Sequence, residues 1–216
     1  MRKSQKIITT ALWSFLVLTM VSVVGLGMWT RQDQPAARVG AAQSDAPMEQ
    51  GLPIWYDAPS FAMTDQNGRP FSSDQLKGQV WVAAFIFTNC PGVCPMMTQQ
   101  MATLQKTVPS PNVKLVSFSV DPARDTPAVL REYASRFKAD GSRWHFLTGA
   151  QDEMLRTAAG LRLSVMPAEG DRPLDHDQRF LLVDAQGRVR GAYQSKDADE
   201  LARLAGDAET LADGKG

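Results

Sequence analysis

The chain has 216 residues, of which 44% are hydrophobic and 21% charged, a composition typical of a globular protein. Its 23 basic and 23 acidic residues cancel, so the composition lacks the strong basic excess typical of nucleic-acid-binding proteins. The charge is uneven along the chain, because residues 1–30 carry three basic residues and no acid, whereas the remainder carries 20 basic and 23 acidic residues.

An uncharged run of 24 residues, Ile7 to Thr30, follows the basic head of residues 1–6. About 20 such residues span a bilayer, and the basic head predicts a cytoplasmic N-terminus. A cleaved signal peptide has a shorter apolar core, and the nearest small-residue cleavage site, Gly25-Leu26-Gly27, lies inside the run. No cysteine follows the run directly, which argues against a lipid anchor. We therefore expect one uncleaved transmembrane helix over residues 7–29, in a bacterial inner membrane, with the C-terminal domain in the periplasm.

Residues 30–56 are rich in Ala, Gln, Pro and Gly and are predicted to form a flexible linker. The domain is expected over residues 57–216 and opens with a hairpin around Asn67-Gly68. The elements that follow are strands at 80–87, 113–120 and 144–149, helices at 95–106, 126–137 and 151–160, a hairpin of 180–183 with 188–193, and a helix from about Asp197. This order predicts an α/β, thioredoxin-like fold, with a central sheet, helices on both faces and an N-terminal hairpin extension.

Both cysteines lie in "FIFTNCPGVCP", Cys90 directly after a buried strand and Cys94 at the start of a helix. Three interpretations are open. An exported chain permits a structural disulfide, although closing so short a loop stabilises a protein by only about 2 kcal/mol. A helix N-terminus lowers the pKa of a thiol and favours a redox couple, although the spacing is one residue longer than CxxC. Two thiolates also select Cu(I), with zinc as a rival, but a metal site requires a third ligand.

The chain has two histidines that could supply this third ligand. His145 lies in a predicted strand, where a packed side chain is the default interpretation. His176 lies in the polar turn "RPLDHDQRF" between Asp175 and Asp177, which could orient its ring. In a thioredoxin-like sheet this turn approaches the cysteine loop, so the topology favours His176.

Four segments together resemble the Sco/SenC family of copper chaperones, in the family's order: "TNCPGVCPMM", "SVDPARDTP", "WHFLTG" and "DHDQRFLLVDAQGRV". The resemblance covers roughly residues 58–212. It implies a thioredoxin fold that binds one copper ion, as Cu(I) or Cu(II), through Cys90, Cys94 and His176. It also implies a role in building the binuclear copper centre of cytochrome c oxidase subunit II, with another periplasmic copper chaperone or a thiol reductant as a further partner.

The chain departs from the family pattern beside the predicted ligands. Gly92 stands where the family often has Asp, and Asp177 stands where it often has Ser. These two changes bear on the redox potential and on partner docking. Asp121, expected at the carboxyl end of its strand, and Asp175 are assigned a supporting or docking role. For Asp125 a helix cap is the simpler interpretation.

The leading hypothesis is therefore a membrane-anchored copper chaperone, a binding protein without turnover of its own. One alternative is a thiol–disulfide reductase that keeps the oxidase cysteines reduced, and another is a copper or redox sensor. The reductase needs Cys90 and Cys94 but not His176, so the histidine discriminates between the first two. The nearby methionines Met96, Met97 and Met101 carry soft sulfur too, but they fit the packed face of a helix.

Overall fold

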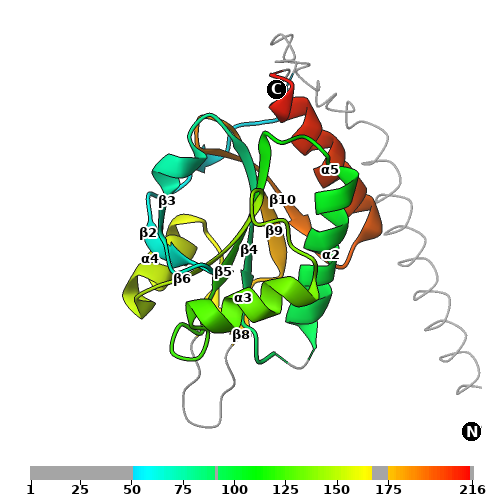
Figure 1. The fold of residues 1–216 in the computed structure, drawn as a ribbon. Coiled ribbons are helices and arrows are strands. Elements are labelled where there is room, and N and C mark those ends of the chain that lie inside the picture. The colour runs from blue at the N-terminus through cyan, green and yellow to red at the C-terminus, as the bar shows by residue number, and fades with distance from the viewer. Residues whose placement is uncertain (1–50, 91, 167–174, 215–216) are drawn as a thin grey trace, which may run out of the picture. The chain divides into compact units, whose positions relative to one another are not determined.

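Residues 51–90, 92–166 and 175–214 are described by the structure, a computed structural model. Within these ranges an eight-stranded mixed sheet forms the centre of the fold, in the order β1-β10-β9-β4-β5-β6-β2-β3 (Figure 1). The chain divides into Met1–Glu49 and Gln50–Gly216, and all described residues belong to the second unit. The predicted basic head and membrane anchor therefore lie outside the described residues. Among the helices that are described, none is long and apolar enough to cross a membrane.

Three parallel strands form the middle of the sheet: β4 (Val80–Ile86), β5 (Val113–Ser119) and β6 (Trp144–Thr148). Every residue of β4 is buried, and its sequence is continuously apolar because both faces of the strand are covered. On the other side of β4, β9 (Arg179–Val183) pairs antiparallel with it, and β10 (Arg188–Gln194) pairs with β9. All five strands agree with the predicted ranges to within about a residue at each end.

Short elements complete the two edges of the sheet. The predicted N-terminal hairpin is present as β2 (Ala62–Asp65) and β3 (Pro70–Ser72), and β2 joins β6. Its turn contains Gly68 at φ +76°, a conformation that glycine adopts without steric cost. The 3-10 helix η1 (Ser73–Leu76) follows, and β1 (Tyr56–Asp57) pairs with β10 at the opposite edge. The sequence patterns predict neither η1 nor β1, because elements of two to four residues carry no usable periodicity.

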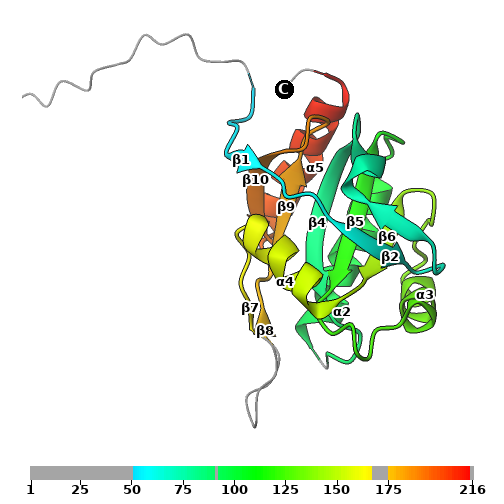
Figure 2. The ribbon, with the colours of Figure 1, turned by 90° about the vertical axis from the view of Figure 1, so that its left-hand side faces the viewer.

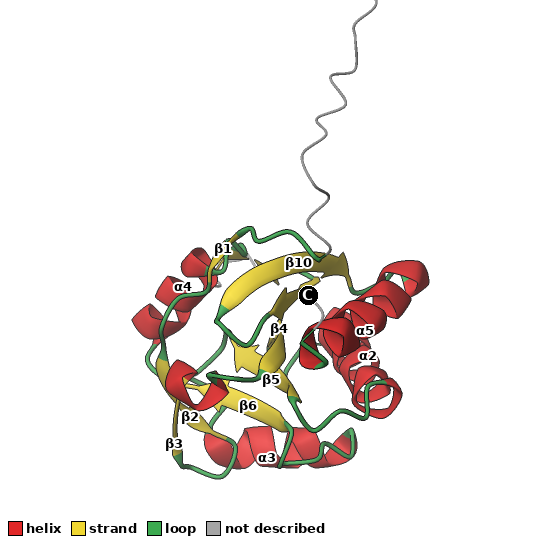
Figure 3. Ribbon diagram, turned by 90° about the horizontal axis from the view of Figure 1, so that it is seen from above, coloured by secondary structure: helices red, strands yellow, loops and turns green. Residues whose placement is uncertain are grey.

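Helices cover both faces of the sheet, as predicted. The first face is covered by α2 (Val93–Thr107), α3 (Pro127–Arg136) and α5 (Ala198–Ala212), whose apolar side chains join those of the parallel strands in one core cluster. On the second face, α4 (Gln151–Gly160) contributes Met154 and Ala158 to a separate cluster. Figures 2 and 3 show α4 on one side of the sheet and α2 with α5 on the other.

The N-terminus of α2 differs from the prediction. The helix begins at Val93 rather than at Pro95, so that Cys94 lies inside its first turn. Proline is tolerated there because the first N–H groups of a helix have no partner within the helix. The start of α3, in contrast, agrees with the sequence: Thr126 accepts a hydrogen bond from the N–H of Val129, and Pro127 occupies the first helical position.

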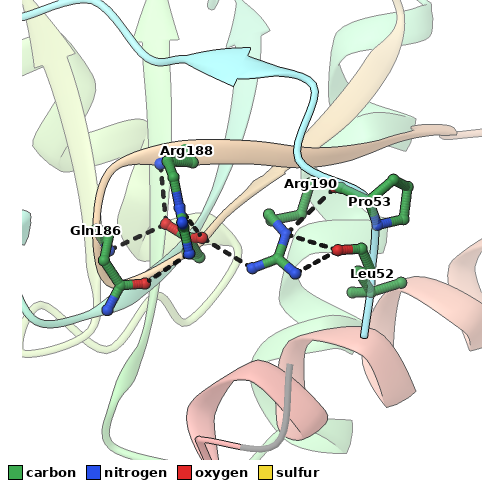
Figure 4. Close-up of polar contacts among 6 residues, drawn as sticks. Leu52, Pro53, Gln186, Arg188 and Arg190 are labelled. Carbon is green, nitrogen blue, oxygen red and sulfur yellow. Dashed lines mark hydrogen bonds and ion pairs between the residues drawn. The ribbon is translucent and has the colours of Figure 1, made fainter. Parts of the chain in front are cut away.

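Arg190 holds the N-terminal segment against the sheet (Figure 4). Its Nε lies 3.1 Å from the carbonyl oxygen of Leu52 and 3.2 Å from that of Pro53, and its Nη1 pairs with Asp184 at 2.9 Å. Arg188 pairs with the same carboxylate at 2.8 Å. Residues 52–56 therefore belong to the folded domain, and the predicted linker, 30–56, is too long at its C-terminal end.

Candidate metal centre

The two cysteines lie at the junction between β4 and α2. Cys90 is partly exposed in the connecting loop, and Cys94 is fully buried in the first turn of α2. The backbone N–H of Cys94 donates to Cys90 Sγ at 3.5 Å, which places the Cys90 sulfur at the N-terminus of the helix. Both cysteines are free thiols in this structure.

His176 approaches Cys94 from a distant part of the chain. It lies in β8 (Asp175–His176), which pairs with β7 (Val165–Met166) in a separate two-stranded sheet. His176 Nε2 lies 3.1 Å from Cys94 Sγ, and its ring packs edge-on against Phe87 with centroids 5.8 Å apart. Figures 1 and 2 both show β8 and the start of α2 at the lower end of the domain. The fold thus brings together the three residues that the sequence singles out.

A hydrogen bond made by the second ring nitrogen of His176 fixes the tautomer of the ring. His176 Nδ1 lies 2.8 Å from the backbone oxygen of Asp177. A carbonyl oxygen can only accept a hydrogen bond, so Nδ1 carries the proton. In the neutral ring the lone pair is then on Nε2, the atom that faces the sulfur of Cys94.

The two thiols differ in acidity. Partial burial opposes ionisation of Cys90, but hydrogen bonds from the backbone of Cys94 and Gly92 outweigh it and hold the pKa of Cys90 below its ordinary value. Burial raises the pKa of Cys94 far above its ordinary value. Cys90 is consequently the more reactive sulfur, because the thiolate is the nucleophile and the metal ligand.

Among the residues that the structure describes, no three His, Cys, Asp or Glu side chains are already spaced as ligands of one metal ion. Metal bonds of about 2.3 Å to sulfur and about 2.0 Å to imidazole, the lengths known for zinc, would separate the two donors by roughly 3.5–3.7 Å. The observed separation of 3.1 Å between Cys94 Sγ and His176 Nε2 is that of a hydrogen bond. A movement of about half an ångström would make both atoms ligands of one ion.

Asp121 and His145 contact other groups of the domain. Asp121 directly follows β5, at the carboxyl end where it was expected, and Arg124 Nε pairs with it at 2.5 Å. Asp175 precedes His176 in β8, and its side chain lies outside what the structure describes. His145 lies in β6 and packs on Phe71 with ring centroids 4.5 Å apart. Burial lowers the pKa of His145, which fits the packed histidine expected there.

The methionines divide between core and surface. Met97 and Met101 are fully buried in the core beneath α2, as their spacing predicts. The prediction is wrong for Met96, which is exposed near the start of the same helix.

Asp125 was not predicted to lie at this site, yet it contacts the loop that carries Cys90. It accepts hydrogen bonds from the hydroxyl of Thr88 at 2.5 Å and from the hydroxyl of Ser119 at 2.5 Å. The interpretation of Asp125 as a helix cap is wrong, because Thr126 caps α3. The available signal was its position: Asp125 follows β5 closely, and the ends of adjacent parallel strands meet at one edge of a sheet.

Comparison with known proteins gives one consistent family. The SCO1/SenC family model matches residues 57–211. A SCO1/SenC family lipoprotein from Bacillus anthracis is 37% identical, with a TM-score of 0.68 over 73% of this chain and 95% of that chain. BsSco has a disulfide switch and is a member of the Sco family of cytochrome c oxidase assembly proteins. It is 33% identical, with a TM-score of 0.67 over 76% of this chain and 97% of that chain.

A third solved structure contains the metal. Bradyrhizobium japonicum ScoI with copper bound is 29% identical, with a TM-score of 0.61 over 72% of this chain and 99% of that chain. These neighbours confirm the predicted thioredoxin-like fold. The family match covers the domain from β1 into α5, and the chain belongs to the SCO1/SenC family.

Proposed function

We propose that this protein is a copper chaperone that binds one copper ion through Cys90 Sγ, Cys94 Sγ and His176 Nε2. The observation that carries the proposal is the 3.1 Å contact between Cys94 and His176, two residues that lie 82 positions apart in the chain. A buried sulfur and an imidazole lone pair that face each other are two donors for one soft ion. Support also comes from B. japonicum ScoI, which has been solved with copper bound.

The donor set suits both copper oxidation states. Two thiolates favour Cu(I), and an imidazole adds the nitrogen that Cu(II) prefers. Because burial raises the pKa of Cys94, this thiol keeps its proton in the metal-free protein. Copper binding therefore releases that proton, and copper affinity should rise with pH.

Copper transfer would begin at Cys90. Cys90 is partly exposed, whereas Cys94 is fully buried and His176 is only 8% exposed. A thiolate of a partner protein therefore reaches a copper ion from the side of Cys90. Ligands could then exchange one at a time, so that the ion is never without a soft ligand.

The acceptor that we propose is subunit II of cytochrome c oxidase, with another periplasmic copper chaperone or a thiol reductant as a further partner. BsSco, a relative of this chain, belongs to a family of cytochrome c oxidase assembly proteins. We further propose a cytoplasmic head at 1–6, an inner-membrane anchor at 7–29, a linker and a periplasmic copper-binding domain. The relative from B. anthracis is a lipoprotein, which supports attachment to a membrane by a different means.

A second candidate function is thiol–disulfide exchange on the oxidase cysteines. It is favoured by the two free thiols of unequal acidity, because a reactive sulfur beside a buried one is the arrangement of a redox couple. This function needs Cys90 and Cys94 but gives His176 no necessary part.

Oxidase assembly in cells grown on scarce copper separates the two functions. We expect both Cys90→Ser and His176→Ala to prevent assembly, although His176→Ala still forms and breaks the Cys90–Cys94 disulfide. The same change at the other histidine, His145→Ala, controls for the loss of a packed imidazole and should support assembly. If His176→Ala assembles oxidase as well as the wild type does, the chaperone proposal is wrong and thiol exchange takes its place.

A further inference from the structure

The carboxylate of Asp125 joins the cysteine loop to the end of β5. Its Oδ1 accepts from the hydroxyl of Thr88 at 2.5 Å, and its Oδ2 accepts from the backbone N–H of Thr88 at 3.1 Å. The hydroxyl of Ser119 also donates to Oδ2, at 2.5 Å. Thr88 lies in the loop that carries Cys90, whereas Ser119 ends β5. One side chain therefore ties the cysteine loop to the neighbouring strand.

Among the hydrogen bonds described for this loop, the one between the Thr88 hydroxyl and Asp125 is the shortest. The last short backbone contact between the adjacent strands is the N–H of Val120 to the oxygen of Ile86, at 2.9 Å. Beyond it, the N–H of Cys90 reaches the oxygen of Phe87 at 3.4 Å, close to the limit of a hydrogen bond. Asp125 supplies the shorter bonds in this region.

Burying the carboxylate of Asp125 away from water costs free energy. The residue is 0% exposed, and a carboxylate leaves water at a large cost unless several donors compensate. Thr88 and Ser119 provide three donors, and a carboxylate has acceptor positions for all of them. An amide in its place would turn an NH₂ group toward one of these donors.

We propose that Asp125 is a positioning residue: it holds Thr88, and through Thr88 the loop, so that the sulfur of Cys90 stays beside Cys94. Binding of copper and formation of the disulfide both require the two sulfurs at one place. If Asp125 orders the loop in advance, neither step bears the entropy cost of ordering it. The copper part of the inference rests on the proposed function, whereas the disulfide part stands without it.

The disulfide equilibrium of the detergent-solubilised full chain tests this role without copper. Dithiothreitol gives two electrons and two protons to the Cys90–Cys94 disulfide and closes to its own cyclic disulfide, so the ratio of products measures how well the two sulfurs are held together. For Asp125→Asn we expect this equilibrium to shift about tenfold toward the dithiol, the effect of losing one charged hydrogen bond. Thr88→Val removes one donor and keeps the shape of the side chain, and should shift the equilibrium about threefold.

Two comparisons separate positioning from a general loss of stability. Asp184 is a buried carboxylate next to Arg190, far from the cysteines, and Asp184→Asn should lower the melting temperature without moving the disulfide equilibrium. Combining Thr88→Val with Asp125→Asn should shift the equilibrium no further than Asp125→Asn alone, because the two changes break the same contact. An equal shift in Asp184→Asn, or no shift in Asp125→Asn and Thr88→Val, would overturn the inference.

Copper competition extends the test to the metal. In a titration against a soft Cu(I) chelator, Asp125→Asn should bind copper about tenfold more weakly than the wild type, for the same reason. If the wild type binds no copper while Asp125→Asn still shifts the disulfide equilibrium, the chaperone proposal fails and the positioning role stands. If the wild type binds copper and neither measurement responds to Asp125→Asn, the positioning role fails alone.

Discussion

At the scale of single residues, Cys90 and Cys94 are four positions apart but chemically unequal. Hydrogen bonds from the N-terminus of α2 lower the pKa of Cys90 despite its partial burial, whereas burial raises the pKa of Cys94. The buried sulfur faces Nε2 of His176, and the partly exposed one lies at the helix N-terminus. In the proposed copper transfer, this inequality would give each sulfur a separate part: Cys90 would meet partners, and Cys94 with His176 would retain the ion.

Alkylation measures this inequality directly. A brief treatment of the reduced full chain with iodoacetamide at pH 7 should label Cys90 and spare Cys94. A lowered pKa leaves more thiolate at a given pH, so labelling of Cys90 should reach half its maximum at a lower pH than labelling of an ordinary cysteine. Peptide mass spectrometry across a pH series gives both rates. Equal labelling of the two cysteines in the folded protein would contradict the assignment, and equal labelling in denaturant is the control.

The sequence singled out Cys90, Cys94 and His176, which the fold brings together, but it did not single out Asp125. The cysteine pair is visible as a motif, and its order with the Asp-His turn carries the family resemblance. Asp125, however, depends on Thr88, which lies 37 residues earlier, and the contact forms only because β4 and β5 pair in a particular register. No local pattern encodes that register. The burial that separates the two thiols in acidity likewise depends on how β8 and α2 pack.

At the scale of elements, the length of a helix or strand decided whether the sequence could predict it. The long apolar strands and amphipathic helices were found because burial of whole faces leaves a periodic pattern. The two-residue strands β1, β7 and β8 were missed, although β8 carries His176. Their positions are set by partners: β1 by β10, and β8 by β7.

The anchoring of β1 makes Arg190 important for stability. Arg190 and Asp184 are only 4% and 2% exposed, so Arg190→Ala leaves a buried charge with one partner fewer. We expect the free energy of unfolding to fall by roughly 3–5 kcal/mol, with faster amide exchange in residues 51–57. Urea denaturation and hydrogen exchange measure the two effects. The matched control is Arg136→Ala, which removes an exposed ion pair with Glu132 and should cost at most about 1 kcal/mol. Similar costs for both changes would contradict the role of Arg190.

Two helical glycines provide opposite predictions for the same substitution. A Cβ atom at Gly160, at the end of α4, would lie 2.6 Å from the ring of Pro59, whereas one at Gly206, in α5, meets nothing within 4 Å. Gly160→Ala should therefore destabilise the protein by about 1–3 kcal/mol through the clash. Gly206→Ala should stabilise it by roughly 0.5–1 kcal/mol, because alanine is the better helix former. Thermal unfolding compares the two, and stabilisation by Gly160→Ala would show that Pro59 does not pack there as described.

At the scale of the whole domain, the candidate metal centre and the N-terminal segment lie at opposite ends. Figures 1 and 2 show the first described residues near the upper end and β8 with the start of α2 at the lower end. The clamp at Leu52 and Pro53 fixes this arrangement.

The predicted anchor has its own test. The mature protein should keep residues 7–29 and remain in the membrane fraction after an alkaline carbonate wash, because a span of about 20 apolar residues inserts stably. Intact mass of the membrane-extracted protein gives the N-terminus. A mature chain that begins after Gly27 would show that the run is a cleaved signal instead.

Copper-edge X-ray absorption on the full chain, loaded with copper and desalted, tests the central claim most directly. We expect one copper per chain, with a first shell of two sulfurs and one nitrogen in the wild type. The nitrogen should disappear in His176→Ala, and all stable binding should disappear in Cys90→Ser. A wild type that retains no copper, or a first shell that is the same in His176→Ala, would contradict the binding of copper by Cys90, Cys94 and His176.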